Sequence, residues 1–129
     1  MKKMNTSAKF HIPYQFPFVD GDHRDFFDDR IFELGVADPS DIAAVYLLSA
    51  LEETRAAFWD LMGVDGHMTD DCWTADWQTP DTRRCVALAS NLTDGTQYPD
   101  LSPASLYASP LRPVLAAAVA YWYAASFTA

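Results

Sequence analysis

Two short, aspartate-rich segments contain the residues of this sequence that could bind a metal ion. His23 follows Asp20 and Asp22, and His67 lies two residues after Asp65. Carboxylate and imidazole groups are ligands for divalent cations, and a metal held by both segments would support hydrolysis. Neither spacing matches a His-Glu-x-x-His helix, a calcium-binding loop or a paired-cysteine zinc site, and Asp-Gly is a common turn pair. We therefore predict turns here and no cofactor, with metal binding by these five residues in a small metal-assisted hydrolase as the alternative.

A cysteine nucleophile would be a second route to chemistry. Cys85 falls on the apolar side of a predicted helix, and no histidine lies near it in the sequence to activate the thiol. A chain without an export signal keeps its thiols reduced, so we expect Cys72 and Cys85 to be buried thiols. The sequence contains no Gly-rich phosphate loop and no Gly-x-Ser-x-Gly elbow. We predict that the protein is not an enzyme.

Acidic residues are concentrated in the first two thirds of the chain. Between Asp20 and Asp81 there are sixteen of them and three basic residues, in a protein whose net charge is −9. A field of this sign repels nucleic acid and anionic membranes and attracts basic surfaces. Direct nucleic-acid binding also requires clustered cations, which are limited here to Arg83-Arg84 and three N-terminal lysines. The expected partner is therefore a basic protein surface.

The spacing of these acids predicts how that surface is bound. Asp22, Asp25, Asp29 and Glu33 fall on one side of a predicted helix, and a row of carboxylates can present charge to a groove that binds phosphates. The protein would then inhibit a host nucleic-acid-binding complex as a nucleic-acid mimic, for example as an anti-CRISPR or other anti-defence protein. A solvated face, with the tryptophans in the core, is the alternative for each residue. The predicted partner-binding residues are Asp22, Asp25, Asp28, Asp29, Glu33, Glu52, Glu53, Asp70, Asp71, Trp73, Asp76 and Trp77.

The fold that must position these residues is predicted as all-α. A chain of 129 residues, half of them apolar, fits one domain with one core, and we take residues 1–129 as a single helical domain. No segment shows the two-residue alternation of a strand. We expect a compact bundle of about five to six helices, an extended aromatic arm over residues 1–20 and an ordered loop over residues 67–78 that contains tryptophans.

Start and stop signals mark the expected helices. The first runs over residues 22–34, and Gly35 ends it. The pattern stays helical over residues 41–62, where Ser49 and Glu52 have the spacing of a capping box and favour two shorter helices. The other predicted starts are Asp38 or Ser40 beside Pro39, Thr79-Pro80-Asp81 with a helix to about Leu92, Ser102-Pro103 and Ser109-Pro110.

The last predicted helix, over residues 113–129, is strongly apolar. Its uncharged part, residues 114–127, is shorter than the about 20 residues that cross a membrane, so we expect a buried core helix and no membrane contact. The alternative is a homo-oligomeric structural module, such as a homodimer, joined through this helix and weakened by loss of Trp122. No apolar stretch follows the N-terminal lysines, so a secretory signal is not indicated and we expect a cytoplasmic protein.

Several short runs between about Arg24 and Tyr98 resemble a known family. They are Asp29-Arg30, Tyr46-Leu47-Leu48, Trp77-Gln78-Thr79 with Thr82-Arg83, and Leu88-Ala89-Ser90-Asn91-Leu92 with Gly95. Together they are similar to small uncharacterised bacterial, phage and mobile-element proteins. The resemblance implies an accessory gene of a mobile element and brings no catalytic residue with it.

Overall fold

Helices make up most of the computed structural model, which describes residues 16–36, 38–63, 68–69, 77–95 and 101–128. No β-strand forms among these residues; Met62 and Met68 make one isolated antiparallel bridge. The predicted all-α fold class is confirmed. The helices are α2 (Gly21–Leu34), α3 (Pro39–Leu48), α4 (Glu52–Ala56), α5 (Phe58–Leu61), α6 (Pro80–Asp94), α7 (Pro103–Ala108) and α8 (Arg112–Thr128).

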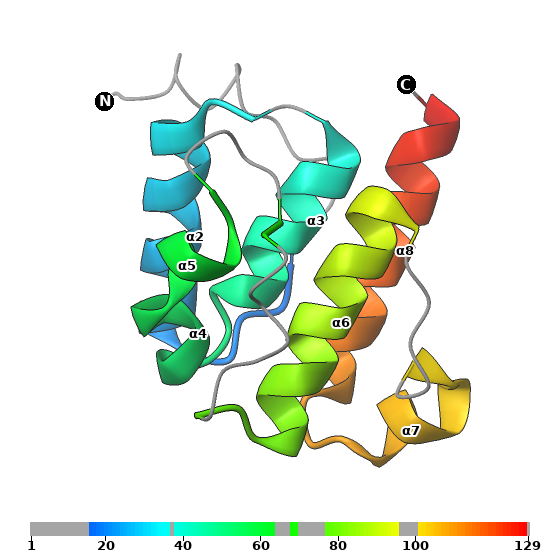
Figure 1. The fold of residues 1–129 in the computed structure, drawn as a ribbon. Coiled ribbons are helices and arrows are strands. Elements are labelled where there is room, and N and C mark those ends of the chain that lie inside the picture. Colours follow the sequence, from blue (N-terminus) through cyan, green and yellow to red (C-terminus); the bar gives the residue numbers. More distant parts are fainter. Residues whose placement is uncertain (1–15, 37, 64–67, 70–76, 96–100, 129) are drawn as a thin grey trace.

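Helix α3 lies at the centre because its sequence is apolar on every side. All residues from Ile42 to Leu48 are buried, as expected for a helix that is hydrophobic all round. Helices α6 and α8 pack against one side of α3, and α2 lies on the other (Figure 1). Each of α3, α6 and α8 has a fully buried alanine: Ala43, Ala89 and Ala118. Small side chains such as these let packed helices approach closely.

Capping residues begin and end the helices where the sequence indicates. The side chains of Asp38, Thr79 and Ser102 each accept a hydrogen bond from a backbone amide in the first turn of the helix that follows. Gly35 and Gly95 end α2 and α6 with φ of 65° and 78°, a left-handed conformation that glycine adopts without strain. The predicted starts at Asp38, Thr79 and Ser102 and the predicted end at Gly35 are therefore confirmed.

The segment after α3 differs from the prediction. Ser49 does not cap the next helix, because its hydroxyl donates back to the carbonyl of Val45 at 2.6 Å. Instead, the hydroxyl of Thr54 accepts a hydrogen bond from the amide of Leu51 at 3.4 Å, just before α4 begins. The capping box predicted for Ser49 and Glu52 is thus wrong. The predicted division of residues 41–62 near Ser49 is confirmed, because α3 ends at Leu48 and two short helices, α4 and α5, follow.

Helix α8 begins two residues after the predicted Ser109-Pro110 signal. Ser109 is fully buried, and its hydroxyl accepts from the amide of Leu111 at 3.0 Å and donates to the carboxylate of Asp81 at 2.8 Å. Since Asp81 lies in the first turn of α6, this serine joins the beginnings of α6 and α8. No helix in the described part of the chain is long and apolar enough to cross a membrane.

An aromatic cluster holds α2 against α3. Tyr46 stacks on Phe16 with ring centres 4.1 Å apart, and its hydroxyl donates to the carbonyl of Pro17. Phe27 from α2 meets the Tyr46 ring edge-on at 6.0 Å. Phe16 is buried, so the end of the predicted arm belongs to the core. The earlier part of that arm, residues 1–15, lies outside the described residues.

Candidate functional site

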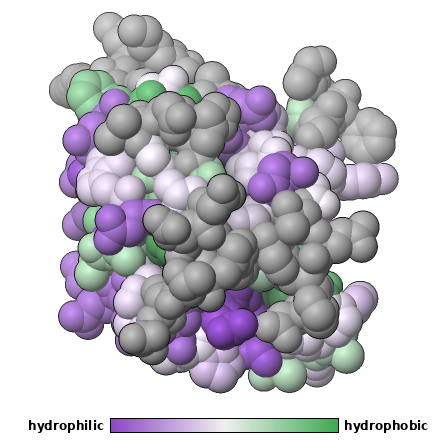
Figure 2. Space-filling model, viewed as in Figure 1, coloured by the Kyte–Doolittle hydropathy of each residue, from purple (hydrophilic) through white to green (hydrophobic). Residues whose placement is uncertain are grey.

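The acidic side of α2 faces solvent along its whole length. Asp22, Asp25, Asp29 and Glu33 are exposed at three- and four-residue spacing, opposite the buried Phe27 and the other apolar residues of the helix. From the first to the last of these acids the axis rises about 16 Å. The left edge of the molecule in Figure 2, where Figure 1 places α2, is largely hydrophilic. We call these four residues, with the adjacent exposed Asp28, the acidic face.

The arginines of α2 neutralise this face only in part. The guanidinium of Arg30 pairs with Glu33 at 2.9 Å and lies over the rings of Phe26 and Trp59, 4.6 and 5.7 Å from their centres. Arg24 lies 5.2 Å from the ring centre of Phe18. Within the part of the chain that the structure describes, Asp22, Asp25 and Asp29 form no ion pair. Their charge is therefore directed to solvent.

Asp28 is influenced mainly by burial and less by its charged neighbours on α2. Partial removal from water raises the pKa of its carboxyl, and the charges of Asp25 and Asp29 raise the pKa further against the opposing effect of Arg24. A cation from a partner would relieve this repulsion. The acidic face can therefore bind positive charge more favourably than isolated surface carboxylates can.

Helices α4 and α5, which lie near α2, carry further exposed acids. The ring of Phe26 on α2 meets the ring of Phe58 on α5 edge-on at 5.5 Å, which places α5 beside α2 (Figure 1). Glu52 and Glu53 are exposed in the first turn of α4, and Asp60 is exposed on α5. The predicted residues of α2 and α4 are thus all accessible, and Asp60 joins them.

Of the two predicted tryptophan anchors, the structure describes only Trp77. Trp77 is half-buried and packs against the core. Trp73, with Asp70, Asp71 and Asp76, lies outside the described residues. The exposed apolar side chains beside the acidic face are Phe32 on α2, 69% exposed, and Trp59 on α5, 40% exposed.

Sequence reasoning missed Phe32 and Trp59 because a large apolar residue on a helix is usually assigned to the core. For Phe32 a signal was present, since it follows Ile31 and so turns away from the side that carries Phe27 and Ile31. For Trp59 no comparable signal exists in so short a helix.

His23 has a structural role that removes it from the metal hypothesis. It is fully buried, and its Nδ1 accepts from the amide of Val19 at 2.9 Å. The proton therefore lies on Nε2, which donates to the carbonyl of Tyr46 at 2.9 Å. Burial lowers the pKa of His23, although the bond to Tyr46 acts in the opposite direction. Both ring nitrogens are occupied, and neither can ligate a metal.

The other residues of the metal hypothesis give it no support. Asp20 caps α2 by accepting from the amide of His23 at 2.9 Å, and Asp22 belongs to the acidic face. Asp65 and His67 lie outside the described residues. No group of three or more His, Cys, Asp or Glu side chains suited to a metal ion occurs in the described ranges.

Cys85 is unsuited to nucleophilic chemistry. Its side chain is fully buried in α6, and burial raises the pKa of the thiol to about 12. The thiol is free and stays protonated at neutral pH. Cys72 lies outside the described residues.

Trp122 on α8, the residue of the alternative dimer prediction, is half-buried and makes a contact within its own chain. Its indole N–H donates to the hydroxyl of Ser40 at 3.0 Å, and the ring packs against the core. Since Ser40 lies in the first turn of α3, this tryptophan holds two helices of one molecule together.

Comparison with known proteins identifies a family without a known activity. A model described as "Family of unknown function (DUF6075)" matches residues 14–129, which is nearly the whole chain. The expected resemblance to uncharacterised proteins is confirmed, while the bacterial, phage or mobile-element setting stays a prediction. No curated protein and no solved structure matches the chain.

Proposed function

Because this chain belongs to the DUF6075 family, whose function is unknown, we propose a function from the geometry of α2. The protein is an acidic interaction module that binds a basic surface of a host nucleic-acid-binding complex. By occupying the groove that receives phosphates, it inhibits that complex as a nucleic-acid mimic. An anti-CRISPR or other anti-defence protein is the most specific form of this proposal.

The observation that carries the proposal is the row of exposed carboxylates on α2. Spacings of three and four residues separate successive charges by about 4.5–6 Å along the axis. One strand of DNA carries a charge about every 3.4 Å, so α2 alone has the lower charge density. Glu52, Glu53 and Asp60 are further exposed acids, on the neighbouring helices α4 and α5. The mimic we propose therefore uses α2, α4 and α5 together.

Apolar contacts would add to the electrostatic ones. Phe32 is the most exposed aromatic residue of α2 and lies next in sequence to Glu33. Trp59 is held in place by Phe58, whose ring it meets edge-on at 5.0 Å. Aromatic side chains of this kind often provide much of the energy of a protein interface. CRISPR effectors hold their nucleic acid in a positively charged channel, which is the type of surface that such a patch would complement.

Affinity capture tests the proposal. The purified protein is immobilised, incubated with nuclease-treated bacterial lysate at low salt and eluted in salt steps. We expect a nucleic-acid-binding complex to elute as the Debye length falls from about 10 Å at 0.1 M to about 3 Å at 1 M salt. The captured complex is then mixed with labelled DNA or RNA, and the protein should displace the nucleic acid, as measured by fluorescence anisotropy.

Charge-reversed variants provide the control. Replacing Asp22, Asp25, Asp29 and Glu33 by lysine should abolish both capture and displacement. The single variants Asp25→Lys and Asp94→Lys change the net charge equally, but Asp94 lies at the end of α6. Only Asp25→Lys should weaken displacement. Equal behaviour of these two variants, or capture that survives the fourfold reversal, would show that the acidic face merely keeps the protein soluble.

A further inference from the structure

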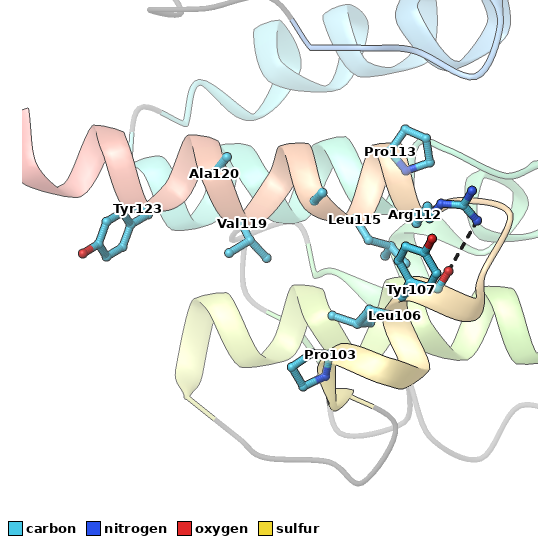
Figure 3. A pocket seen from close by; sticks show the side chains of 10 residues that line it. Pro103, Leu106, Tyr107, Arg112, Pro113, Leu115, Val119, Ala120 and Tyr123 are labelled. Atoms are coloured by element: carbon cyan, nitrogen blue, oxygen red, sulfur yellow. Dashed lines mark hydrogen bonds between the residues drawn. The ribbon is translucent and has the colours of Figure 1, made fainter.

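The chain segment before α2 fills an apolar recess where α2, α3 and α8 meet. The buried ring of Phe16 lies there, with the ring centres of Phe27 on α2 and Tyr121 on α8 at 5.6 and 5.0 Å. By contrast, the apolar hollow of about 700 Å³ between α7 and α8 is open to solvent (Figure 3). We call residues 16–19, which occupy the recess and lead toward α2, the strap.

Hydrogen bonds hold the strap at two points. The hydroxyl of Tyr46 on α3 donates to the carbonyl of Pro17. The amide of Val19 donates to Nδ1 of His23 at 2.9 Å. The ring of Phe18 meets the imidazole edge-on, with the ring centres 4.9 Å apart. The strap therefore covers the imidazole of His23 as well as the recess.

A proton on His23 would break one of these two attachments. The neutral imidazole accepts at Nδ1 and donates at Nε2, whereas the imidazolium donates at both nitrogens. A protonated Nδ1 would direct its N–H at the N–H of Val19, which now donates to it. The bond from Nε2 to the carbonyl of Tyr46 needs no change. The conflict therefore falls on the strap and not on α3.

The charges near the imidazole do not remove this conflict. Among the residues that the structure describes, the groups beside His23 that carry charge or titrate are Asp20 before α2, the phenol of Tyr46 on α3 and Arg55 on α4. Burial lowers the pKa of His23 and Arg55 lowers it further, while the bond to Tyr46 and the carboxylate of Asp20 raise it. Asp20 already accepts from the backbone amide of His23 as the cap of α2. The proton is therefore bound most easily once the strap has moved away and water reaches Nδ1.

The helices can keep their packing without the strap. Phe16 is the one strap residue in the buried core, and α3 packs against α6 and α8 through its own side chains. We propose that the strap is released by acid: when His23 binds a proton, residues 16–19 leave α3 while the helices stay folded. Release empties the recess and uncovers the ring of Tyr46 at low pH. This device does not depend on the function proposed for the acidic face.

Amide hydrogen exchange of the full chain, followed by NMR at pH 7.5 and pH 5, tests the proposal. Each exchange rate is divided by the rate of an unstructured peptide at the same pH, which gives an opening constant for that amide. With the ordinary pKa of 6.5 for His23 in the open strap, the opening constant of Val19 should rise by up to about 30-fold between the two pH values. At both pH values it should exceed the opening constant of the buried Leu47 on α3 by at least about tenfold, because the helices stay closed.

His23→Gln is the matched variant that does not titrate. A glutamine can accept from the amide of Val19 and donate to the carbonyl of Tyr46. In this variant the opening constant of Val19 should change by less than about twofold between pH 7.5 and pH 5. Circular dichroism checks that the variant folds.

Tyr46→Phe tests the other attachment of the strap. The substitution removes the hydroxyl that donates to Pro17 and keeps the ring. The opening constant of Val19 should rise by about tenfold at both pH values, and the effect of pH should persist because His23 is unchanged. This variant and the wild type test the proposal even where His23→Gln does not fold.

The same measurements can overturn the proposal. Equal opening constants for Val19 and Leu47 would show that the strap leaves only when the whole molecule unfolds. An opening constant of Val19 that is the same at pH 7.5 and pH 5 in the wild type would show that protonation does not release the strap. The same rise in folded His23→Gln as in the wild type would assign the effect to another group.

Discussion

Replacement of His23 should destabilise the protein in a way that depends on pH. The imidazole connects the backbone before α2, at Val19, to the last turn of α3, at Tyr46. The last four carbonyls of a helix have no intrahelical donor, so the Nε2 proton satisfies a group that the helix itself leaves open. His23 thus makes one hydrogen bond to the backbone just before α2 and another to the last turn of α3.

The size of the effect follows from these two bonds. His23→Ala removes the donor to the buried Tyr46 carbonyl, at about 1–3 kcal/mol, and the acceptor of the partly buried Val19 amide, which costs less because water can replace it, so we expect a loss of about 1–4 kcal/mol. His23→Gln can keep an acceptor and a donor on one side chain and should cost less. Urea unfolding at pH 7.5, followed by circular dichroism, measures both losses.

The pH dependence follows from the lowered pKa of His23. Below pH 6.5 the unfolded chain binds a proton at this residue, whereas the folded protein keeps the imidazole neutral. The unfolded state therefore takes up more protons, and wild-type stability falls as the pH drops below 6.5, by up to about 1.4 kcal/mol per pH unit. The loss levels off below the folded-state pKa. Arg55 lowers this pKa and Asp20 raises it, both by smaller amounts than burial does.

The difference between wild type and His23→Gln isolates this one group. Other titrating residues contribute equally to both proteins, so the difference in unfolding free energy should shrink between pH 7.5 and pH 5. A constant difference over that range would refute the reasoning. So would an NMR titration in which the folded imidazole of His23 ionises near pH 6.5.

Three further outcomes follow from single contacts. Thr79→Ala should cost about 1 kcal/mol by removing the cap of α6, measured by urea unfolding; an unchanged midpoint would contradict the capping role. In a Cys72→Ser background, Cys85 should resist alkylation at pH 8 in buffer and react in urea, because its thiol is buried with a pKa of about 12; fast reaction of the folded protein would show that it is accessible. Trp122→Ala should lower the melting temperature through loss of the contact with Ser40, measured by circular dichroism; an unchanged melting temperature would contradict that role.

Local signals in the sequence were sufficient for most of the helix boundaries. A cap such as Thr79, or a glycine such as Gly35, acts on residues within one turn of itself, so its effect can be read from a short stretch of chain. The alternation of Phe27 and Ile31 with acids likewise predicted which side of α2 is exposed. Where two local signals competed, as at Ser49, the prediction was wrong because the hydroxyl also had a nearby helix carbonyl to bond.

The sequence itself thus determined the acidic charge, the apolar character of the C-terminal helix and the all-α class. The tertiary structure alone decided that His23 bonds to backbone groups, that Trp122 reaches Ser40, and that Phe32 and Trp59 remain exposed beside the acidic face. The physical reason is that hydrogen-bond partners and burial depend on which segments pack together. Ser40 and Trp122 are 82 positions apart, and no local pattern records that they meet.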